Sequence, residues 1–387
     1  VLVGADAATA AALRDAAAPA RVVRAERASA FQRLAADHYR LDPADPDQLA
    51  SLTTALATDG ISATAYVRCA RTRDTDGAGS ALPDAYLESW ALAVAVTGTR
   101  PTGPVPVLFL HPRDPAAPRP HEDALGALAR TVAAEAPQLR CRAVGHDATA
   151  TAGDLAAVIA AESTDLSAES EVRHTGGTRL AVRHETLAVP AGNGAGVLRE
   201  DGVYLVTGGG GSLAALLVDR LVTRGPVRLV LTGRSAPGPE LTQRIEGWRR
   251  RGAEVTHVRG DVAHTDDVLA AVTCARETYG RIDGVFHCAG SVDDGMFFRK
   301  DPERSAAVLA AKVAGTRNLD EATADDDLAF FALFSSVSAS VANPGQADYA
   351  YGNAFMEHFA EQRAARADRP GVSVAVGWPL WADGGMR

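Results

Sequence analysis

The chain of 387 residues contains little cysteine, and none of its four cysteines forms a C-x-x-C pair. They stand far apart, at Cys69, Cys141, Cys274 and Cys288. This spacing argues against a disulfide framework and against a zinc site, so we expect no metal. Unpaired cysteines fit a reducing compartment, and we expect a cytoplasmic location. The histidines are also scattered, and we expect surface positions for His121, His257 and His264.

Long apolar runs and blocks of basic residues are absent as well. No apolar run reaches the roughly 18 residues of a membrane span, and no signal peptide is apparent. The formal net charge is −9, so we expect neither a nucleic-acid surface nor a membrane partner. The sequence opens VLVGAD without a methionine, and we interpret it as a segment of a longer polypeptide.

The strongest boundary signal is the glycine-rich stretch 188–202, which predicts a linker. After it, apolar β-rich runs alternate with helical patterns. This alternation predicts an α/β fold with a doubly wound parallel sheet over residues 203–387. The expected strands are 204–207, 227–232, 255–258, 282–287, 329–335 and 372–377, and the expected helices include 213–223 and 266–279.

Residues 1–187 show a weaker form of the same alternation. Residues 1–16 repeat the strand, glycine and helix pattern of residues 204–221, but with one glycine in place of four. We therefore predict that residues 1–187 form a structural subdomain without a cofactor. Strands are expected within 1–4, 63–70, 104–112 and 140–145, and helices at 87–97 and 121–136, the second with an acidic first turn.

A cluster of glycines follows the strand expected at 204–207 and opens the next helix. The loop consists of Gly208, Gly209, Gly210, Gly211, Ser212 and Leu213. Glycines let the backbone approach a pyrophosphate, and the first amide groups of a helix favour an anion. The loop is therefore predicted to bind a dinucleotide, although a plain glycine-rich turn has the same composition.

The ends of the next strands extend this prediction. Arg234 stands where dinucleotide folds usually have Asp or Glu. A guanidinium suits a 2′-phosphate, so we predict NADPH rather than NADH, although an ordinary surface arginine fits as well. Asp261 and Val262 follow the third strand, where the carboxylate could accept from an adenine amino group. Ala289 and Gly290 follow the fourth strand, where Gly290 could lie close to the cofactor ribose.

The stretch QADYAYGNAFM, residues 346–356, lacks the lysine that many nucleotide-dependent reductases place four residues after a tyrosine. Here that position is Asn353, which shares a helix face with Tyr349, whereas Tyr351 points elsewhere. The chain has only two lysines. Lys300 lies in a polar patch, whereas Lys312 has apolar neighbours on an expected helix and is our candidate. A snorkelling surface lysine would have the same pattern.

A serine hydroxyl is expected beside the tyrosine hydroxyl. Ser336 ends an expected strand and precedes Tyr349 by 13 residues. Spacing alone does not exclude Ser335, Ser338 or Ser340.

Lys312, Ser336, Tyr349 and Asn353 follow one another at intervals of 24, 13 and 4 residues. This arrangement resembles the ketoreductase domains of modular polyketide synthases, a branch of the short-chain dehydrogenase/reductase superfamily in which the lysine and asparagine exchange places. Residues 1–187 resemble the structural subdomain of such domains, a truncated Rossmann-like fold. The phrase DYAYGNAFM and the ending VGWPLWADGGM are similar to assembly lines whose acyltransferases are separate proteins.

The resemblance implies an enzyme that reduces a β-ketoacyl thioester with NADPH. Its substrate would be held by phosphopantetheine on an acyl carrier protein, and its other partners would be neighbouring domains of the same synthase. Tyr349 would donate the proton and Ser336 would hydrogen-bond the same oxygen. Lys312 would favour the phenolate and hold the ribose, and Asn353 would position Lys312 or a relay water.

Two departures from the family pattern concern the glycine loop. Gly210 replaces a threonine, and Ala214 replaces the last glycine, where alanine is the usual substitute. They motivate a rival reading, a catalytically impaired scaffold with weak NADPH binding. A second rival, a free-standing reductase of small ketones, conflicts with the order of lysine and serine and with the cofactorless first half.

Asp293 and Asp294 follow Val292 where one ketoreductase class has Leu-Asp-Asp, and without the resemblance they would pass as a solvated acidic turn. The other class has a tryptophan at the position of Val341. The resemblance therefore implies a B-type enzyme that gives the D-hydroxy product.

Overall fold

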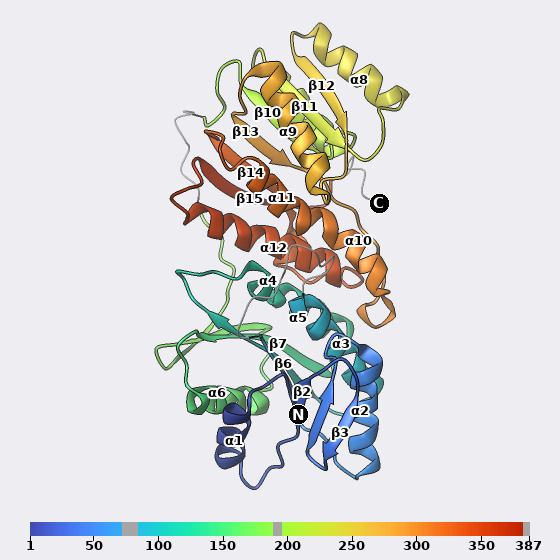
Figure 1. Ribbon diagram of the computed structural model, residues 1–387, viewed down its shortest axis with the longest axis vertical. Coiled ribbons are helices and arrows are strands. Elements are labelled where there is room, and N and C mark those ends of the chain that lie inside the picture. Colours follow the sequence, from blue (N-terminus) through green and yellow to red (C-terminus); the bar gives the residue numbers. More distant parts are fainter. Residues whose placement is uncertain (72–83, 189–195, 382–387) are drawn as a thin grey trace. The chain divides into compact units, whose positions relative to one another are not determined.

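The structure is a computed structural model that describes residues 1–71, 84–188 and 196–381 (Figure 1). The chain forms two compact units, each made of several segments. The first unit comprises Val1–His184, Asp294–Ser305 and Ser340–Ala354. The second unit comprises Glu185–Asp293, Ala306–Ala339 and Phe355–Arg387. Two segments from the second half of the chain therefore belong to the first unit.

Six parallel strands form the sheet of the second unit, within its described residues. They are β10 (Val203–Thr207), β11 (Arg228–Gly233), β12 (Glu254–Arg259), β13 (Gly284–His287), β14 (Phe330–Ser336) and β15 (Val372–Trp378). Their order, β12-β11-β10-β13-β14-β15, is that of a doubly wound dinucleotide fold. The predicted α/β class and all six predicted strands of this half are confirmed.

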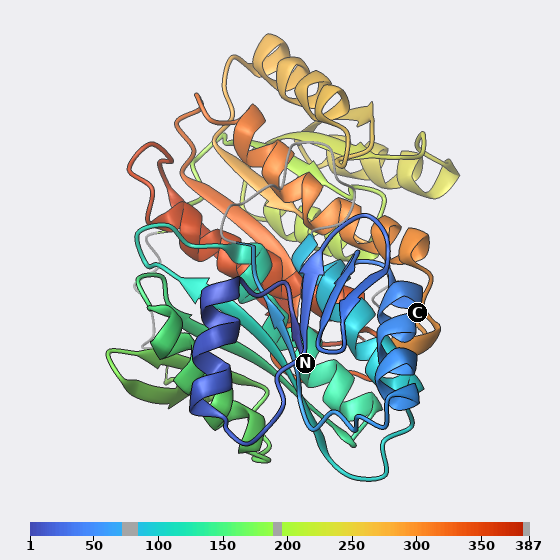
Figure 2. The same cartoon turned by 60° about the horizontal axis from the view of Figure 1, so that its bottom comes forward.

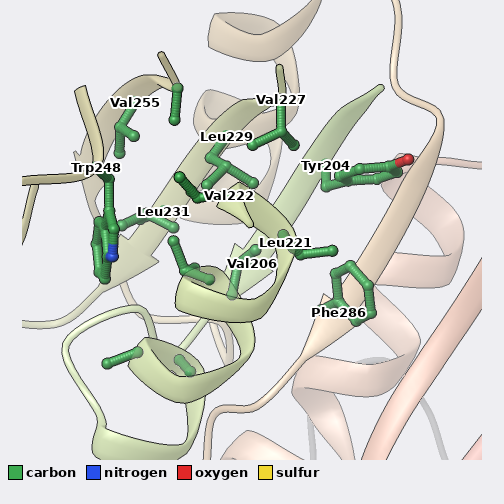
Figure 3. Packing of buried hydrophobic residues seen from close by; sticks show 14 of the residues in the cluster. Tyr204, Val206, Leu221, Val222, Val227, Leu229, Leu231, Trp248, Val255 and Phe286 are labelled. Atoms are coloured by element: carbon green, nitrogen blue, oxygen red, sulfur yellow. The ribbon is translucent and has the colours of Figure 1, made fainter. Parts of the chain in front are cut away.

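Helices cover both faces of this sheet. Alternate side chains of a strand point to opposite faces, so the strands present apolar side chains to the helices on both sides. Tyr204 and Val206 of β10 pack with Leu221 and Trp248 in one apolar cluster (Figure 3). Leu205, between them, lies with Val268 on the other face. The helices after β10 are α7 (Ser212–Val222), α8 (Pro239–Arg250), α9 (Thr265–Tyr279), α10 (Pro302–Lys312), α11 (Ala314–Ala322) and α12 (Ala347–Ala364), with short 3-10 turns η1 (Phe297–Arg299) and η2 (Val337–Ala339).

The first unit contains, in its described residues, a nine-stranded sheet. Its strands are β1 (Leu2–Val3), β2 (Arg24–Arg27), β3 (Gln32–Ala35), β4 (His38–Leu41), β5 (Tyr66–Cys69), β6 (Val105–Arg113), β7 (Leu139–Asp147), β8 (Glu171–Thr175) and β9 (Thr178–Ala181). The order is β3-β4-β2-β1-β5-β6-β7-β8-β9, and only the outer pairs β3–β4 and β8–β9 are antiparallel among the paired strands described. The predicted strands correspond to β1, β5, β6 and β7. Two of the strands that were not predicted, β2 (RAER) and β3 (QRLA), carry no apolar period.

The helices of the first unit also lie on both faces of its sheet. They are α1 (Ala7–Ala16), α2 (Pro46–Thr58), α3 (Asp84–Gly98), α4 (Pro120–Asp123), α5 (Leu125–Glu135) and α6 (Ala152–Thr164). The dark blue α1 packs beside the green α6, and α2 packs beside α3 (Figure 2). Among the described helices of both units, none combines the length and apolar character that crossing a bilayer requires.

The single helix expected at 121–136 is wrong, because the structure divides it at Ala124 into α4 and α5. Glu122 does not serve an exposed helix start. It is buried, and Arg68 of β5 donates to both of its carboxylate oxygens, at 2.5 and 3.1 Å. His121 is 5% exposed, so its expected surface position is also wrong.

Of the linker expected at 188–202, residues 189–195 lie outside the described part of the chain. Beyond them, the chain is already attached to the second unit. Arg199 pairs with the buried Asp283 at 2.7 Å, and its backbone N–H donates to the Tyr204 hydroxyl at 2.9 Å.

Candidate active site

The glycine loop is shaped by close backbone contacts. Gly208 has φ +65°, a left-handed conformation that side chains disfavour. A Cβ there would lie 2.9 Å from the backbone N and Cα of Ala289. At Gly209, a Cβ would lie 2.8 Å from the Cβ of Leu231. The turn closes where the Gly211 N–H donates to the Gly208 carbonyl oxygen at 2.8 Å.

Helix α7 begins at this loop with Gly211 as its N-cap, a residue that has no side chain to occupy the first amide groups. The helix start therefore suits an anion such as a pyrophosphate. Neither departure from the family pattern disturbs this arrangement. A Cβ at Gly210 would meet only Leu241 Cδ2, at 3.7 Å, and Ala214 is already packed in the apolar cluster of the second unit.

The loop gives a pair of contrasting substitutions. Gly208→Ala should lower the free energy of unfolding by at least about 1–2 kcal/mol, because it combines a left-handed residue with a backbone clash. It should also weaken binding of the dinucleotide predicted for this loop. Gly210→Ala should change stability by less than about 0.5 kcal/mol. Urea unfolding and fluorescence titration with NADPH measure both effects, and equal behaviour of the two variants would contradict this description of the loop.

Arg234 follows β11 and is exposed. Its backbone carbonyl accepts from Nε of Arg259 at 3.0 Å. Arg259 ends the neighbouring strand β12, so a second guanidinium lies close to the predicted phosphate position. Sequence reasoning missed Arg259, although its place at a strand end, next to that of Arg234, was a usable signal.

Asp261 and Val262 lie where the sequence predicts, directly after β12. The Asp261 N–H donates to Oδ2 of Asp267 at 2.7 Å, and Oδ1 of Asp261 accepts from the Ala263 N–H at 3.0 Å. Val262 is buried against Gly315, where an added Cβ would lie 2.9 Å from Val262 Cγ1. These contacts hold the Asp261 carboxylate at the carboxyl edge of the sheet.

Lys312 is the last residue of α10 and is only 2% exposed. Its Nζ donates to the Phe334 carbonyl oxygen at 3.4 Å. A Cβ at Gly290 would lie 3.4 Å from the same Nζ, so the ammonium lies beside the glycine that follows β13. Burial lowers the pKa of Lys312 to about 7. The alternative of a snorkelling surface lysine is therefore wrong.

A buried histidine fixes the backbone around Lys312. The Ala289 N–H donates to Thr207 Oγ1 at 3.2 Å, and Thr207 Oγ1 lies 2.7 Å from His287 Nδ1. His287 Nε2 is 3.0 Å from the Ala311 carbonyl, which only accepts, so Nε2 carries the hydrogen and Nδ1 accepts from Thr207. Burial, and secondly Lys312, lower the pKa of His287 to about 3, so it is neutral.

Within the described residues, no group of three or more His, Cys, Asp or Glu is arranged to hold a metal ion.

The choice among the serines is narrowed by the alternation of side chains along β14. Ser335 Oγ donates to Glu357 Oε1 at 2.8 Å. Ser336 is the last residue of β14 and points to the opposite face, where its Oγ accepts from the Ser338 N–H at 3.2 Å. Ser336 and Lys312 both belong to the second unit, and the Lys312 acceptor Phe334 precedes Ser336 by two residues.

Tyr349 and Asn353 lie one turn apart on α12, as their spacing predicts. Asn353 Nδ2 donates to the Tyr349 carbonyl at 2.7 Å, and both residues are buried. Tyr351 is engaged elsewhere, because its hydroxyl donates to the His121 carbonyl at 2.7 Å. Tyr349 and Asn353 belong to the first unit, so the structure describes this pair and the pair Lys312–Ser336 separately.

The residue before Tyr349 is held by the second lysine of the chain. Lys300, expected in a polar patch, is only 8% exposed, and its Nζ lies 2.8 Å from Asp348 Oδ1. The same Oδ1 accepts from the Tyr349 N–H at 2.8 Å. Burial raises the pKa of Asp348. The rarity of lysine in this chain was the signal that could have marked Lys300 as well as Lys312.

The two predicted stereocontrol residues fall in different units. Asp293 is the last residue of its segment in the second unit, and Asp294 opens a segment of the first. Oδ1 of Asp294 accepts from Gln346 Nε2 at 3.0 Å, close in sequence to Tyr349.

The first unit has a protein side chain where the second has its open glycine loop. Gly4, between β1 and α1, has φ +78°, and a Cβ there would lie 2.2 Å from Nη1 of Arg27. The Arg27 guanidinium donates to the carbonyl oxygens of Gly4 and Cys69 and to the carboxylate of Glu88. This guanidinium fills the space in front of the first strand–helix turn.

Two family models match different parts of the chain. Residues 202–383 match the KR domain family, and residues 1–162 match a family described as beta-ketoacyl synthase-like, N-terminal. Polyketide synthase PksL of Bacillus subtilis is 33% identical over 267 residues, which are 68% of this chain and 6% of that protein. The chain thus spans only a small part of the curated relatives it matches.

Solved structures match over nearly the whole chain. An N-terminal ketoreductase from the macrolactin assembly line has a TM-score of 0.86 at 24% identity, over 99% of this chain and 79% of that one, and supports the fold. An A-type ketoreductase from a modular polyketide synthase has a TM-score of 0.80 at 26% identity, over 100% of this chain and 80% of that one.

Proposed function

Because the chain belongs to the ketoreductase domains of polyketide synthases, within the short-chain dehydrogenase/reductase superfamily, we propose that it reduces the β-carbonyl of an acyl thioester with NADPH. The observation that carries this proposal is the buried ammonium of Lys312. It lies between Gly290 and the Phe334 carbonyl, at the strand ends where a dinucleotide fold binds its cofactor.

The substrate we propose is a β-ketoacyl chain held by phosphopantetheine on an acyl carrier protein. Neighbouring domains of the same synthase would be further partners, in a cytoplasmic assembly line whose acyltransferases are separate proteins. Support comes from the interval pattern of Lys312, Ser336, Tyr349 and Asn353. Residues 1–187 would act as a structural subdomain, which is supported by the Arg27 side chain in front of its first strand–helix turn.

In the proposed reduction, the residues of this chain supply the proton and the nicotinamide, when bound, supplies the hydride to the carbonyl carbon. The carbonyl π pair moves to oxygen, and the Tyr349 hydroxyl donates its proton to that alkoxide. Ser336 donates a hydrogen bond to the same oxygen. A nearby cation lowers the pKa of a phenol, and the Lys312 ammonium would supply that positive charge. Asn353 would position either Lys312 or a relay water.

The product we propose is the D-configured β-hydroxy thioester, as expected of a B-type ketoreductase. Support comes from Asp293 and Asp294 after Val292, and from Val341 where the other class has tryptophan. The experiment that tests the function is NADPH oxidation with a β-ketoacyl thioester on a carrier protein, followed by chiral analysis of the alcohol. Saturable NADPH binding without any turnover would instead favour the non-catalytic scaffold.

The preference for NADPH gives a direct prediction at Arg234. A charge-assisted bond to the 2′-phosphate contributes about 1.5–3 kcal/mol, so Arg234→Ala should raise the Kd for NADPH roughly tenfold to hundredfold. The Kd for NADH, which has no 2′-phosphate, should stay the same. Arg224→Ala, at an exposed arginine beyond the end of α7, is the matched control. Equal losses for both cofactors would contradict the role assigned to Arg234.

A further inference from the structure

Glu135, the last residue of α5, holds two segments from the second half of the chain. Its Oε2 accepts from the Phe297 N–H at 2.6 Å, and its Oε1 accepts from the Gly345 N–H at 2.7 Å. All three residues belong to the first unit. A single planar carboxylate therefore fixes the separation of two backbone amide groups that are far apart in sequence.

The two segments are also joined to each other directly. The Gly295 N–H donates to the Gly345 carbonyl at 2.9 Å, and Gln346 Nε2 donates to Asp294 Oδ1 at 3.0 Å. One segment thus carries the predicted stereocontrol residue Asp294. The other opens α12, which carries Tyr349.

The surroundings of Glu135 are built to hold it in place. Trp90 Nε1 donates to the Phe297 carbonyl at 2.8 Å, so the peptide on each side of Phe297 is anchored to the first unit. Burial raises the pKa of Glu135, while hydrogen bonds from the Phe297 and Gly345 amides, and the charge of Lys300, act in the opposite direction. Lys300 itself is paired with Asp348, next to Tyr349. The half-buried carboxylate of Glu135 has two amide partners and a neighbouring cation.

We propose that Glu135 is a positioning residue that determines which face of the carbonyl is reduced. It does so by fixing the segment of Asp294 against the turn that opens the helix of Tyr349. This inference rests on the proposed function, because it concerns the stereochemistry of that reaction. A tenfold change in the ratio of the two alcohols corresponds to only about 1.4 kcal/mol, so a small shift of one segment is enough to change it.

The test compares Glu135→Ala and Glu135→Gln with the native chain. Glu135→Ala should raise the fraction of the minor alcohol about tenfold, because neither amide retains its acceptor. Glu135→Gln retains one acceptor oxygen and should give an intermediate ratio, so it also serves if the alanine variant fails to fold. The Kd for NADPH should not change. The amides of Phe297 and Gly345 should exchange hydrogen faster in both variants.

Glu162→Gln is the control, because Glu162 is another hydrogen-bonded carboxylate of the first unit, in its case buried and paired with Arg142. It should lower stability without changing the ratio of alcohols. An unchanged ratio in a folded Glu135 variant would overturn the inference, and so would an equal change in the Glu162 variant. A native chain without turnover would refute the proposed function and, with it, the stereochemical role. Amide exchange would then still show whether Glu135 holds the two segments.

Discussion

Tyr349→Phe should lower the turnover of a β-ketoacyl thioester at least about 10²–10⁴-fold, the usual contribution of a general acid. The substitution removes the hydroxyl that would protonate the alkoxide, but it retains the ring that is buried on α12. Binding of NADPH should be unchanged. The measurements are the rate of NADPH oxidation at saturating substrate and a fluorescence titration of the cofactor.

Tyr351→Phe is the control that the chain itself offers. Tyr351 is also buried on α12, but its hydroxyl donates to the His121 carbonyl. Losing that bond should cost roughly 1 kcal/mol of stability and leave turnover within a small factor of the native value. Retained turnover in Tyr349→Phe, or equal losses in the two variants, would eliminate Tyr349 as the acid.

Lys312→Met should have opposite effects on stability and on turnover. Burial lowers the pKa of Lys312 from 10.5 to about 7, which corresponds to on the order of 5 kcal/mol against the charged form. The unfolded chain binds this proton more tightly, so the penalty is complete below the folded pKa and is relieved as pH rises toward 10.5. Lys312→Met should therefore stabilise the protein near neutral pH, and the gain should shrink at alkaline pH.

Turnover of Lys312→Met should fall at least about 100-fold, because the proposed mechanism relies on the Lys312 cation to lower the pKa of the Tyr349 phenol. Urea unfolding at about pH 6 and about pH 10, together with the NADPH assay, measures both effects. Lys300→Met is the contrasting variant. It leaves the buried Asp348 without its ammonium partner, and breaking a buried pair costs about 3–5 kcal/mol. A destabilised Lys312→Met with native turnover would show that Lys312 is merely structural.

The strands of the second unit could be predicted because each is a short apolar run bounded by turn residues. VYLVT and RLVLTG, for example, are buried over most of their length. The first unit was harder to predict because β3 and β9 are polar and exposed, and pairing with β4 and β8, rather than burial, defines them. The break at Ala124 was missed because the buried pair of Glu122 with Arg68 is not visible in a local pattern.

In the candidate site, too, features that depend on neighbouring residues could be predicted, whereas contacts between residues far apart in the sequence could not. The position of Lys312 followed from its rarity and from its apolar neighbours. Spacing alone could not choose Ser336 over Ser335, and the bond from Ser335 to Glu357 narrowed that choice. Glu135 escaped prediction because its amide partners lie far along the chain, and no spacing rule connects residues across such separations.

The segments Asp294–Ser305 and Ser340–Ala354 leave the ribosome long after Val1–His184, to which they pack. During synthesis, Tyr86 and Trp90 therefore lack their hydrogen-bond acceptors, Ser305 Oγ and the Phe297 carbonyl, until these residues have been translated. The nascent first unit remains incomplete until most of the second has been translated. Exchanging either half of the chain for that of a relative would therefore disturb the folding of both units, because no single cut in the polypeptide separates them.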